Sequence, residues 1–114
     1  ATYGILADAL APLGLAYLSV LHAEPTGDLV KELRTRFGGG LITNSGFGAI
    51  TTRDEAIDLI DESHADAVAV GRLALANPDL VERWKGEHPV NEPNAATFYA
   101  PGAEGYTDYP RLAV

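Results

Sequence analysis

The residues best suited to chemistry in this sequence stand at the ends of two short apolar runs. The first run, Leu41–Asn44, passes into small and polar residues around Gly46. The second run, Ala67–Val70, ends at Gly71 and Arg72. Such a run is typical of a buried parallel strand, and a glycine followed by an arginine where it ends combines open backbone with a fixed positive charge. The combination predicts a site for a phosphate group.

Helices and strands that alternate along the chain would bring these two strand ends together. The strands are expected to start at Leu15, Leu41 and Ala67, which are spaced 26 residues apart. This regular period predicts an α/β fold with a parallel sheet, either open and doubly wound or part of a (β/α)8 barrel. The predicted elements are a helix over Thr2–Leu13 closed by Gly14, a strand over Leu15–Leu21, a helix capped by Thr26 or Asp28 and ended by Gly38, a strand over Leu41–Asn44, a helix from the capping box Thr52–Glu55 to about His64, and a strand over Ala67–Val70.

The size of the chain argues against a complete barrel. Its 114 residues, 46% of them hydrophobic, suffice for one small domain with one core. A whole barrel takes roughly 200 residues or more, and three strands with unpaired outer edges make a poor isolated fold. We therefore expect a piece of a larger barrel, whose missing strands lie in another chain or in a removed upstream segment.

Charge and composition exclude several classes of function. The net charge is -8 and the eight lysines and arginines are scattered, which argues against nucleic-acid and anionic-membrane partners. The absence of cysteine excludes a disulfide framework, a zinc-thiolate site and a thiol nucleophile, and we expect no metal site. The longest apolar stretches, such as Leu15–Leu21, are too short to span a bilayer. A cytoplasmic protein is the default expectation.

The regular alternation stops after Val70. Asn77 and Pro78 predict the start of a new helix, with Asn77 as its N-cap and Gly86 at its end. Leu80, Val81 and Trp84 are expected on the buried side of this helix. The predicted organisation of a partial TIM-barrel domain over 1–114 is therefore βα repeats over 1–76, a closing helix over 77–86 and an irregular C-terminal tail over 87–114 that wraps over the barrel.

Four motifs in order along the chain resemble one protein family. LITNSGF, DAVAVGR, ANPDLVERW and TFYAPGAEGYTDYP look like the C-terminal part of the Old Yellow Enzyme family of flavin-dependent ene-reductases. The resemblance covers essentially the whole chain and implies about strands 6 to 8 of a TIM barrel with their helices and the tail. The family binds FMN at the C-terminal end of the barrel, with the phosphate between the loops after strands 7 and 8, where barrels in general carry phosphates.

The resemblance implies seven FMN-binding residues in three groups. Three lie after the first strand and approach the phosphate and ribityl end, chiefly through backbone N–H groups. A glycine and an arginine after the second strand supply an amide and a charge, since a guanidinium fork suits a phosphate dianion. Two aromatic residues of the tail lie beside the flavin rings or, in the alternative reading, pack the tail onto the core. The seven are Ser45, Gly46, Phe47, Gly71, Arg72, Phe98 and Tyr99.

A second motif of the family is imitated in the wrong place. His88 and Asn91 have the H-x-x-N spacing with which the family holds the carbonyl oxygen of the substrate. In the family this pair lies at strand 4, with a tyrosine two positions beyond it, where this chain has Pro93. We therefore expect no catalytic residue within these 114 residues.

The implied function is the FMN-binding part of an NAD(P)H-dependent ene-reductase. Such an enzyme reduces activated C=C bonds of α,β-unsaturated carbonyl or nitro compounds, and here its catalytic residues would come from a missing upstream segment or partner chain. The expected partners are that complementary segment, carrying barrel strands 1 to 5, and a small-molecule alkene. We expect the chain to be inactive alone. The alternatives are another phosphate-binding TIM-barrel enzyme of the isomerase or aldolase type, and a non-catalytic fragment that only associates.

Overall fold

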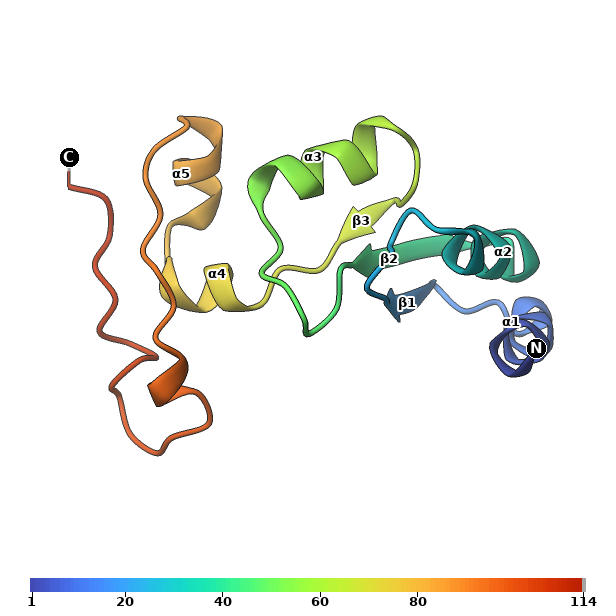
Figure 1. Ribbon diagram of the computed structural model, residues 1–114, viewed down its shortest axis with the longest axis horizontal. Coiled ribbons are helices and arrows are strands. Elements are labelled where there is room, and N and C mark those ends of the chain that lie inside the picture. Colours follow the sequence, from blue (N-terminus) through green and yellow to red (C-terminus); the bar gives the residue numbers. More distant parts are fainter. Residues whose placement is uncertain (114) are drawn as a thin grey trace. The chain divides into compact units, whose positions relative to one another are not determined.

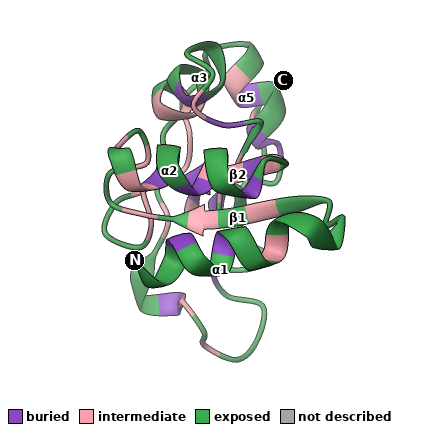
Figure 2. Ribbon diagram, turned by 90° about the vertical axis from the view of Figure 1, so that its right-hand side faces the viewer, coloured by how far each residue is buried: buried purple, intermediate pink, exposed green. Residues whose placement is uncertain are grey.

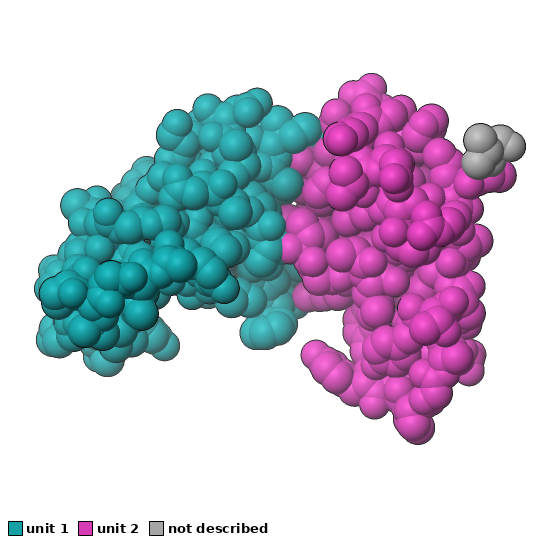
Figure 3. All heavy atoms as spheres, turned by 180° about the vertical axis from the view of Figure 1, so that it is seen from behind, with its two compact units in different colours: residues 1–49, 54–69 teal, residues 50–53, 70–114 magenta. Residues whose placement is uncertain are grey.

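The computed structural model describes residues 1–113 and shows alternating helices and strands (Figure 1). The chain divides into two compact units, which are described separately (Figure 3): unit 1 is Ala1–Ala49 with Asp54–Ala69, and unit 2 is Ile50–Arg53 with Val70–Val114. The elements are α1 (Thr2–Leu10), η1 (Ala11–Leu13), β1 (Tyr17–Leu21), α2 (Asp28–Phe37), β2 (Gly40–Asn44), α3 (Arg53–Asp61), β3 (Ala67–Val68), α4 (Arg72–Ala76), α5 (Leu80–Lys85) and η2 (Ala95–Thr97).

A parallel sheet runs through unit 1. In the described part of the chain it has three strands in the order β1-β2-β3. β1 and β2 pair along their full length, from Tyr17 opposite Gly40 to Leu21 opposite Asn44. β3 continues the sheet with Val68 opposite Thr43. The predicted α/β class and the parallel direction of the strands are confirmed.

The core of unit 1 lies where α1 and α2 meet the sheet (Figure 2). α2 buries one apolar face, formed by Val30, Leu33 and Phe37, and Gly38 closes the helix in the left-handed conformation, with φ +72°. The left-handed region favours glycine because an L side chain clashes there. The buried centre is formed by Ala7, Leu33 and Phe37, against which Leu10, Leu18, Val20 and Leu29 pack.

α1 does not bury the face that its apolar residues predict. Tyr3 and Leu6 are 64% and 49% exposed, whereas the small residues Gly4 and Ala7 are buried. A Cβ on Gly4 would lie 3.2 Å from the guanidinium of Arg36, which is a tight contact, so the glycine lets that side chain pack closely against α1. Arg36 in turn pairs with Asp8 at 2.6 Å. α1 therefore joins α2 through small residues, Leu10 and an ion pair, whereas Tyr3, Ile5 and Leu6 stay exposed.

Several predicted boundaries in unit 1 are wrong by a few residues. The first helix changes to a 3-10 turn at Ala11–Leu13, where Pro12 cannot donate the next helical hydrogen bond. α2 begins after Gly27, so neither Thr26 nor Asp28 is its N-cap. The first two strands begin at Tyr17 and Gly40, not at Leu15 and Leu41, so the even spacing is lost, whereas the predicted start of the third at Ala67 is confirmed. β3 covers only Ala67–Val68, although the Ala69 N–H still donates to the Thr43 carbonyl at 3.1 Å.

The helices of unit 2 also differ from the prediction. The short helix α4 was not expected, and α5 begins at Leu80 after Asp79, not at Pro78 after Asn77. Asn77 is not an N-cap because its side-chain Oδ1, the atom that would accept from the helix, accepts the Asn91 N–H at 2.7 Å. Val81, expected to be buried, is 64% exposed.

Arg83 of α5 is buried, although Val81 of the same helix is exposed. Its side chain is buried, and its Nε lies 2.7 Å from Oδ1 of Asp79, which is buried as well. The two remaining guanidinium nitrogens donate to the carbonyls of Pro89 at 2.6 Å and Pro110 at 3.0 Å. Asp79 Oδ2 accepts the Leu112 N–H at 2.6 Å. The hydrogen bond from Leu112, followed by that from Arg83, lowers the pKa of Asp79.

Two asparagines complete this polar interior. Asn77 Oδ1 accepts the Asn91 N–H at 2.7 Å, and Asn77 Nδ2 donates to the Asn91 carbonyl at 3.1 Å. Asn91 Nδ2 donates to the carbonyls of Ala76 at 2.9 Å and Pro110 at 2.8 Å. The two tail segments around Asn91 and Pro110 are thus tied to α4 and α5 through hydrogen bonds.

Candidate functional site

The end of β2 is tied to the exit of β3 by one side chain. Asn44 Nδ2 donates to the Ala69 carbonyl at 2.9 Å, and Asn44 Oδ1 accepts the Gly46 N–H at 2.8 Å. Both contacts lie within unit 1. The carboxyl ends of the two strands are therefore neighbours, as in any pair of adjacent parallel strands.

Ser45, the first residue after β2, already holds a carboxylate. Its N–H donates to Glu55 Oε1 at 3.0 Å and its hydroxyl donates to Oε2 at 3.2 Å. Glu55 comes from the first turn of α3. The sequence singled it out as a capping-box residue, but its bonds to Ser45 were not predicted. This pair of donors is chemically suited to anionic oxygens, and a phosphate could use it only by displacing or sharing Glu55.

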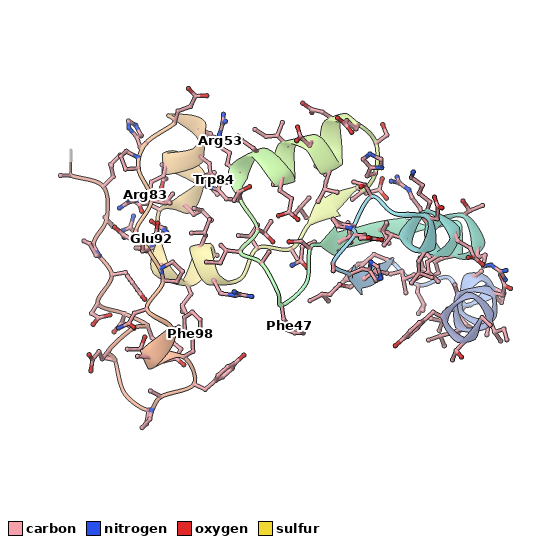
Figure 4. All side chains as sticks on the ribbon, in the orientation of Figure 1. Phe47, Arg53, Arg83, Trp84, Glu92 and Phe98 are labelled. Carbon is pink, nitrogen blue, oxygen red and sulfur yellow. The ribbon has the colours of Figure 1, made fainter. Side chains whose placement is uncertain are left out.

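The next residues form an open turn. Gly46 has φ +79°, in the left-handed region where a side chain would be strained. The side chain of Phe47 projects from the loop and is 84% exposed (Figure 4). At Gly48 a Cβ would meet no atom of the described residues within 4 Å. The loop therefore offers accessible backbone beside one exposed aromatic ring.

Gly71 and Arg72 belong to unit 2, at the start of α4. Gly71 is exposed, and a Cβ there would also meet no described atom within 4 Å. Arg72 is the first residue of α4 and is half-buried. An accessible glycine amide and a guanidinium are thus adjacent in the chain, which is a donor set that fits a phosphate dianion.

Phe98 and Tyr99 follow the short helix η2 in unit 2. Asn94 caps this helix, since its Oδ1 accepts the Ala96 N–H at 3.1 Å. Phe98, labelled in Figure 4, is half-buried, whereas Tyr99 is 95% exposed and has φ +61°. A positive φ is uncommon for a bulky residue and costs free energy. Tyr99 does not pack onto the core of its unit.

The seven predicted residues fall into two sets. Ser45, Gly46 and Phe47 are consecutive in unit 1, and Gly71, Arg72, Phe98 and Tyr99 are in unit 2. The sequence missed Asn44 and Glu55, the two side chains that shape the first set. Within residues 1–113 no group of three or more His, Asp and Glu side chains could hold a metal ion. In the same range, no helix combines the length and the apolar character needed to cross a membrane.

In the H-x-x-N motif of the tail, the second member, Asn91, has a structural role. Both donor hydrogens of the Asn91 side-chain amide are directed at backbone carbonyls, as described for unit 2. His88 is exposed, and its backbone N–H donates to the Arg83 carbonyl at 2.8 Å. Asn91 is therefore engaged in holding the tail.

The chain is similar to flavin-dependent reductases. It is 40% identical, over 116 residues, to a 12-oxophytodienoate reductase-like protein of Solanum lycopersicum, with 100% of this chain and 31% of that protein covered. It is 39% identical to a probable flavin mononucleotide-dependent alkene reductase of Leishmania infantum, with 84% of this chain and 26% of that protein covered. The chain thus spans about a third of these relatives or less. No family model matches it.

Solved structures give the same result. Morphinone reductase in complex with tetrahydroNAD matches with a TM-score of 0.81 at 40% identity, covering 97% of this chain and 30% of that one. The old yellow enzyme from Trypanosoma cruzi matches with a TM-score of 0.83 at 38% identity, covering 97% and 29%. These neighbours are TIM-barrel proteins, and none of the four relatives described here is an isomerase or aldolase. In sequence and in fold, the chain therefore belongs to the Old Yellow Enzyme family, and it corresponds to one part of such a protein.

Proposed function

We propose that these 114 residues are the FMN-binding C-terminal part of an NAD(P)H-dependent ene-reductase, which reduces activated C=C bonds of α,β-unsaturated carbonyl or nitro compounds. The observation that carries the proposal is the 40% identity to a reductase-like protein over the whole chain. A relative named for flavin mononucleotide supports FMN, and a neighbour solved with tetrahydroNAD supports a nicotinamide donor.

We place the phosphate of FMN after β2 and β3, which we take to be barrel strands 7 and 8, with β1 as strand 6. The Asn44–Ala69 hydrogen bond of 2.9 Å supports this, because Gly71 follows Ala69 by only two residues. Gly71 would donate its amide to the phosphate, and Arg72 would contribute the charge. Because Gly46 has no side chain, the loop backbone next to Phe47 could approach the ribityl end of FMN closely. Ser45 would donate to the phosphate only by releasing or sharing Glu55.

Phe98 and Tyr99 would flank the flavin rings. When bound, FMN would supply the hydride chemistry between the nicotinamide and the alkene. The residues of this chain bind and orient that group. The residues that hold the substrate carbonyl and donate a proton belong, in this proposal, to the segment that completes the barrel, so the 114 residues alone should not reduce an alkene.

Arg72→Ala tests the phosphate site. In the assembled protein, meaning these residues together with the completing segment, it should weaken FMN binding by roughly 1.5–3 kcal/mol, the usual range for hydrogen bonds to charged groups. Riboflavin has no phosphate, so its affinity should hardly change. Arg111→Ala removes an exposed guanidinium of the same unit and serves as the matched control. An equal loss for FMN and riboflavin would show that Arg72 acts through the fold.

The requirement for a completing segment is supported by the surface of unit 1. Among the described residues β1 pairs only with β2, so its other edge is unpaired. Beside it lies a groove of about 330 Å³, lined on one side by Tyr3, Leu6 and Leu10 of α1. An unpaired strand edge next to apolar surface favours aggregation. The isolated chain should therefore aggregate or fold poorly, and a chain carrying strands 1 to 5 should rescue it. A cooperative thermal transition of the monomeric chain alone would contradict this.

A further inference from the structure

The segment 94–109 of unit 2 is a closed loop that holds Tyr99 at its exposed side. The Tyr109 hydroxyl accepts the Asn94 N–H at 2.8 Å, which brings the two ends of the segment together. Between them Tyr99 keeps a left-handed backbone, φ +61°, with 95% of its surface exposed. A strained and exposed aromatic residue persists only where the surrounding structure determines its conformation. The contacts that determine this conformation lie at the neck of the loop, which is formed by Asn94, Thr97, Gly105 and Tyr109.

Gly105 lies against the side chain of Thr97 in that neck. Both residues are buried, and Gly105 has φ +77°. A Cβ on Gly105 would overlap the Oγ1 and Cβ atoms of Thr97. Only glycine therefore fits at position 105, for two separate reasons: its backbone conformation and the lack of space beside it.

Hydrogen bonds hold each of these two residues in place. Thr97 Oγ1 donates to the Asn94 carbonyl at 2.8 Å, so the threonine side chain that faces Gly105 is fixed. The Gly105 N–H donates to Asp108 Oδ1 at 2.8 Å. On the Tyr99 side, the Ala100 N–H donates to the Thr97 carbonyl at 3.2 Å, across the strained residue. The conformation of Tyr99 is thus tied through Thr97 to Gly105.

We infer that Thr97 and Gly105 form a steric lock that positions Tyr99 toward the ligand of the site. Both are positioning residues, because neither is exposed enough to touch a ligand itself. The lock fixes the backbone from which the Tyr99 ring projects, and so the place of one aromatic ring beside a planar, ring-containing group. The inference rests on the proposed function, in which that group is the flavin.

Gly105→Ala and Gly102→Ala separate the lock from backbone strain. Both glycines have positive φ, +77° and +98°, but a Cβ on Gly102 meets no described atom within 4 Å. Chymotrypsin cleavage after Phe98 and Tyr99, followed in the assembled protein without flavin, reports how often the loop opens. Gly105→Ala should be cleaved on the order of tenfold faster than Gly102→Ala, because proteolysis follows the population of the open loop. Equal rates would show that there is no lock.

The flavin spectrum tests whether the lock positions Tyr99. With FMN bound, Tyr99→Ala should shift the visible absorption bands, and Gly105→Ala should reproduce that shift while Gly102→Ala does not. A wild-type spectrum in Gly105→Ala, with the loop nevertheless cleaved faster, would overturn the positioning role.

A milder variant covers the case in which Gly105→Ala is not recovered as folded protein. Tyr109→Phe removes the acceptor of the Asn94 N–H without changing the shape of the neck, and should give the same two changes at smaller size. Unchanged cleavage and an unchanged spectrum in Tyr109→Phe would then overturn the lock. If no variant, and not even the original protein, binds FMN, the proposed function fails, whereas the cleavage rates still decide whether the lock exists.

Discussion

Unit 1 and unit 2 differ in the charged side chains that their interiors hold. The centre of unit 1 is apolar, with Ala7, Leu33 and Phe37 packed between helices and sheet. Unit 2 buries a charged pair, Asp79 and Arg83, and encloses polar side chains in its interior. Apolar burial is non-directional, whereas each buried polar group needs its own partner. Unit 1 should therefore tolerate conservative apolar changes. The stability of unit 2 should depend on individual hydrogen-bonding atoms.

The difference follows from the backbone that each unit must hold. Unit 1 satisfies its backbone groups largely through helices and the sheet. The tail of unit 2 has little regular structure, so its N–H and C=O groups need side-chain partners. Arg83 serves the carbonyls of Pro89 and Pro110, and Asp79 serves the Leu112 N–H. The polar interior is thus the means by which an irregular tail acquires a fixed course.

Removing Arg83 should have the largest effect. Arg83→Met keeps an unbranched apolar stem but removes the guanidinium, so Asp79 loses its buried partner and two carbonyls lose their donors. We expect the assembled protein to lose about 3–5 kcal/mol of unfolding free energy, the usual cost of breaking a buried ion pair from one side. Urea denaturation measures it. Lys85→Met, an exposed change in the same helix, is the control and should have little effect.

Truncating the core of unit 1 should cost somewhat less. Leu33→Ala leaves a cavity among Ala7, Phe37 and their neighbours, and should lower the unfolding free energy by about 2–4 kcal/mol. This loss should not depend on salt or pH, because no charge is removed. Val81→Ala, at a residue 64% exposed, is the control and should change stability by about 0.5 kcal/mol or less. A larger loss for Leu33→Ala than for Arg83→Met would reverse the contrast between the units.

The same contrast explains which features could be predicted from the sequence. The stripe of α2, its Gly38 cap and the parallel strands follow from spacing within one element, so periodicity finds them. The burial of Arg83 depends on Pro110, 27 residues further along, and no local pattern carries that information. Asn77 has the sequence of an N-cap, but its side chain binds Asn91 instead, 14 residues away. Long-range polar partners override local preference in both cases.

The candidate site shows the same division. Gly71 and Arg72 could be proposed from the sequence because they stand at the end of a predicted strand. The small residues around Gly46 could be proposed for the same reason. That Ser45 holds Glu55 could not be read from spacing, because the glutamate had a plausible local role in the capping box Thr52–Glu55. The exposure of Tyr99 was equally hidden, since a tail aromatic is more often packed. Which donors are already engaged is a property of the folded chain.

A third change tests the H-x-x-N motif, at an intermediate expected effect. Asn91→Ala removes the donors to the Ala76 and Pro110 carbonyls, and should lower the unfolding free energy by about 1–2 kcal/mol. The expectation from sequence, that Asn91 is not catalytic, concerns turnover and stays a prediction. His88→Ala should change the unfolding free energy by about 0.5 kcal/mol or less. The rate of alkene reduction should stay within about threefold of the original. If the alkene no longer oxidised the reduced flavin in His88→Ala, this pair would be catalytic after all.

The smallest effect at neutral pH concerns the charge state of Asp79. The hydrogen bonds from Leu112 and Arg83 lower its pKa in the folded protein below the ordinary value of 3.8. A group whose pKa is lower in the folded state than in the unfolded state stabilises the fold above the unfolded value, and this stabilisation is lost as the pH falls through the folded value. The unfolding free energy should therefore be flat near neutral pH with respect to this group and should decline below about pH 4. Denaturation curves at a series of acidic pH values measure the slope, and Asp28→Asn, at an exposed aspartate of unit 1, gives the matched comparison. Asp79→Asn should lower stability at neutral pH and flatten the decline in acid, and an unaltered decline would mean that other carboxylates cause it.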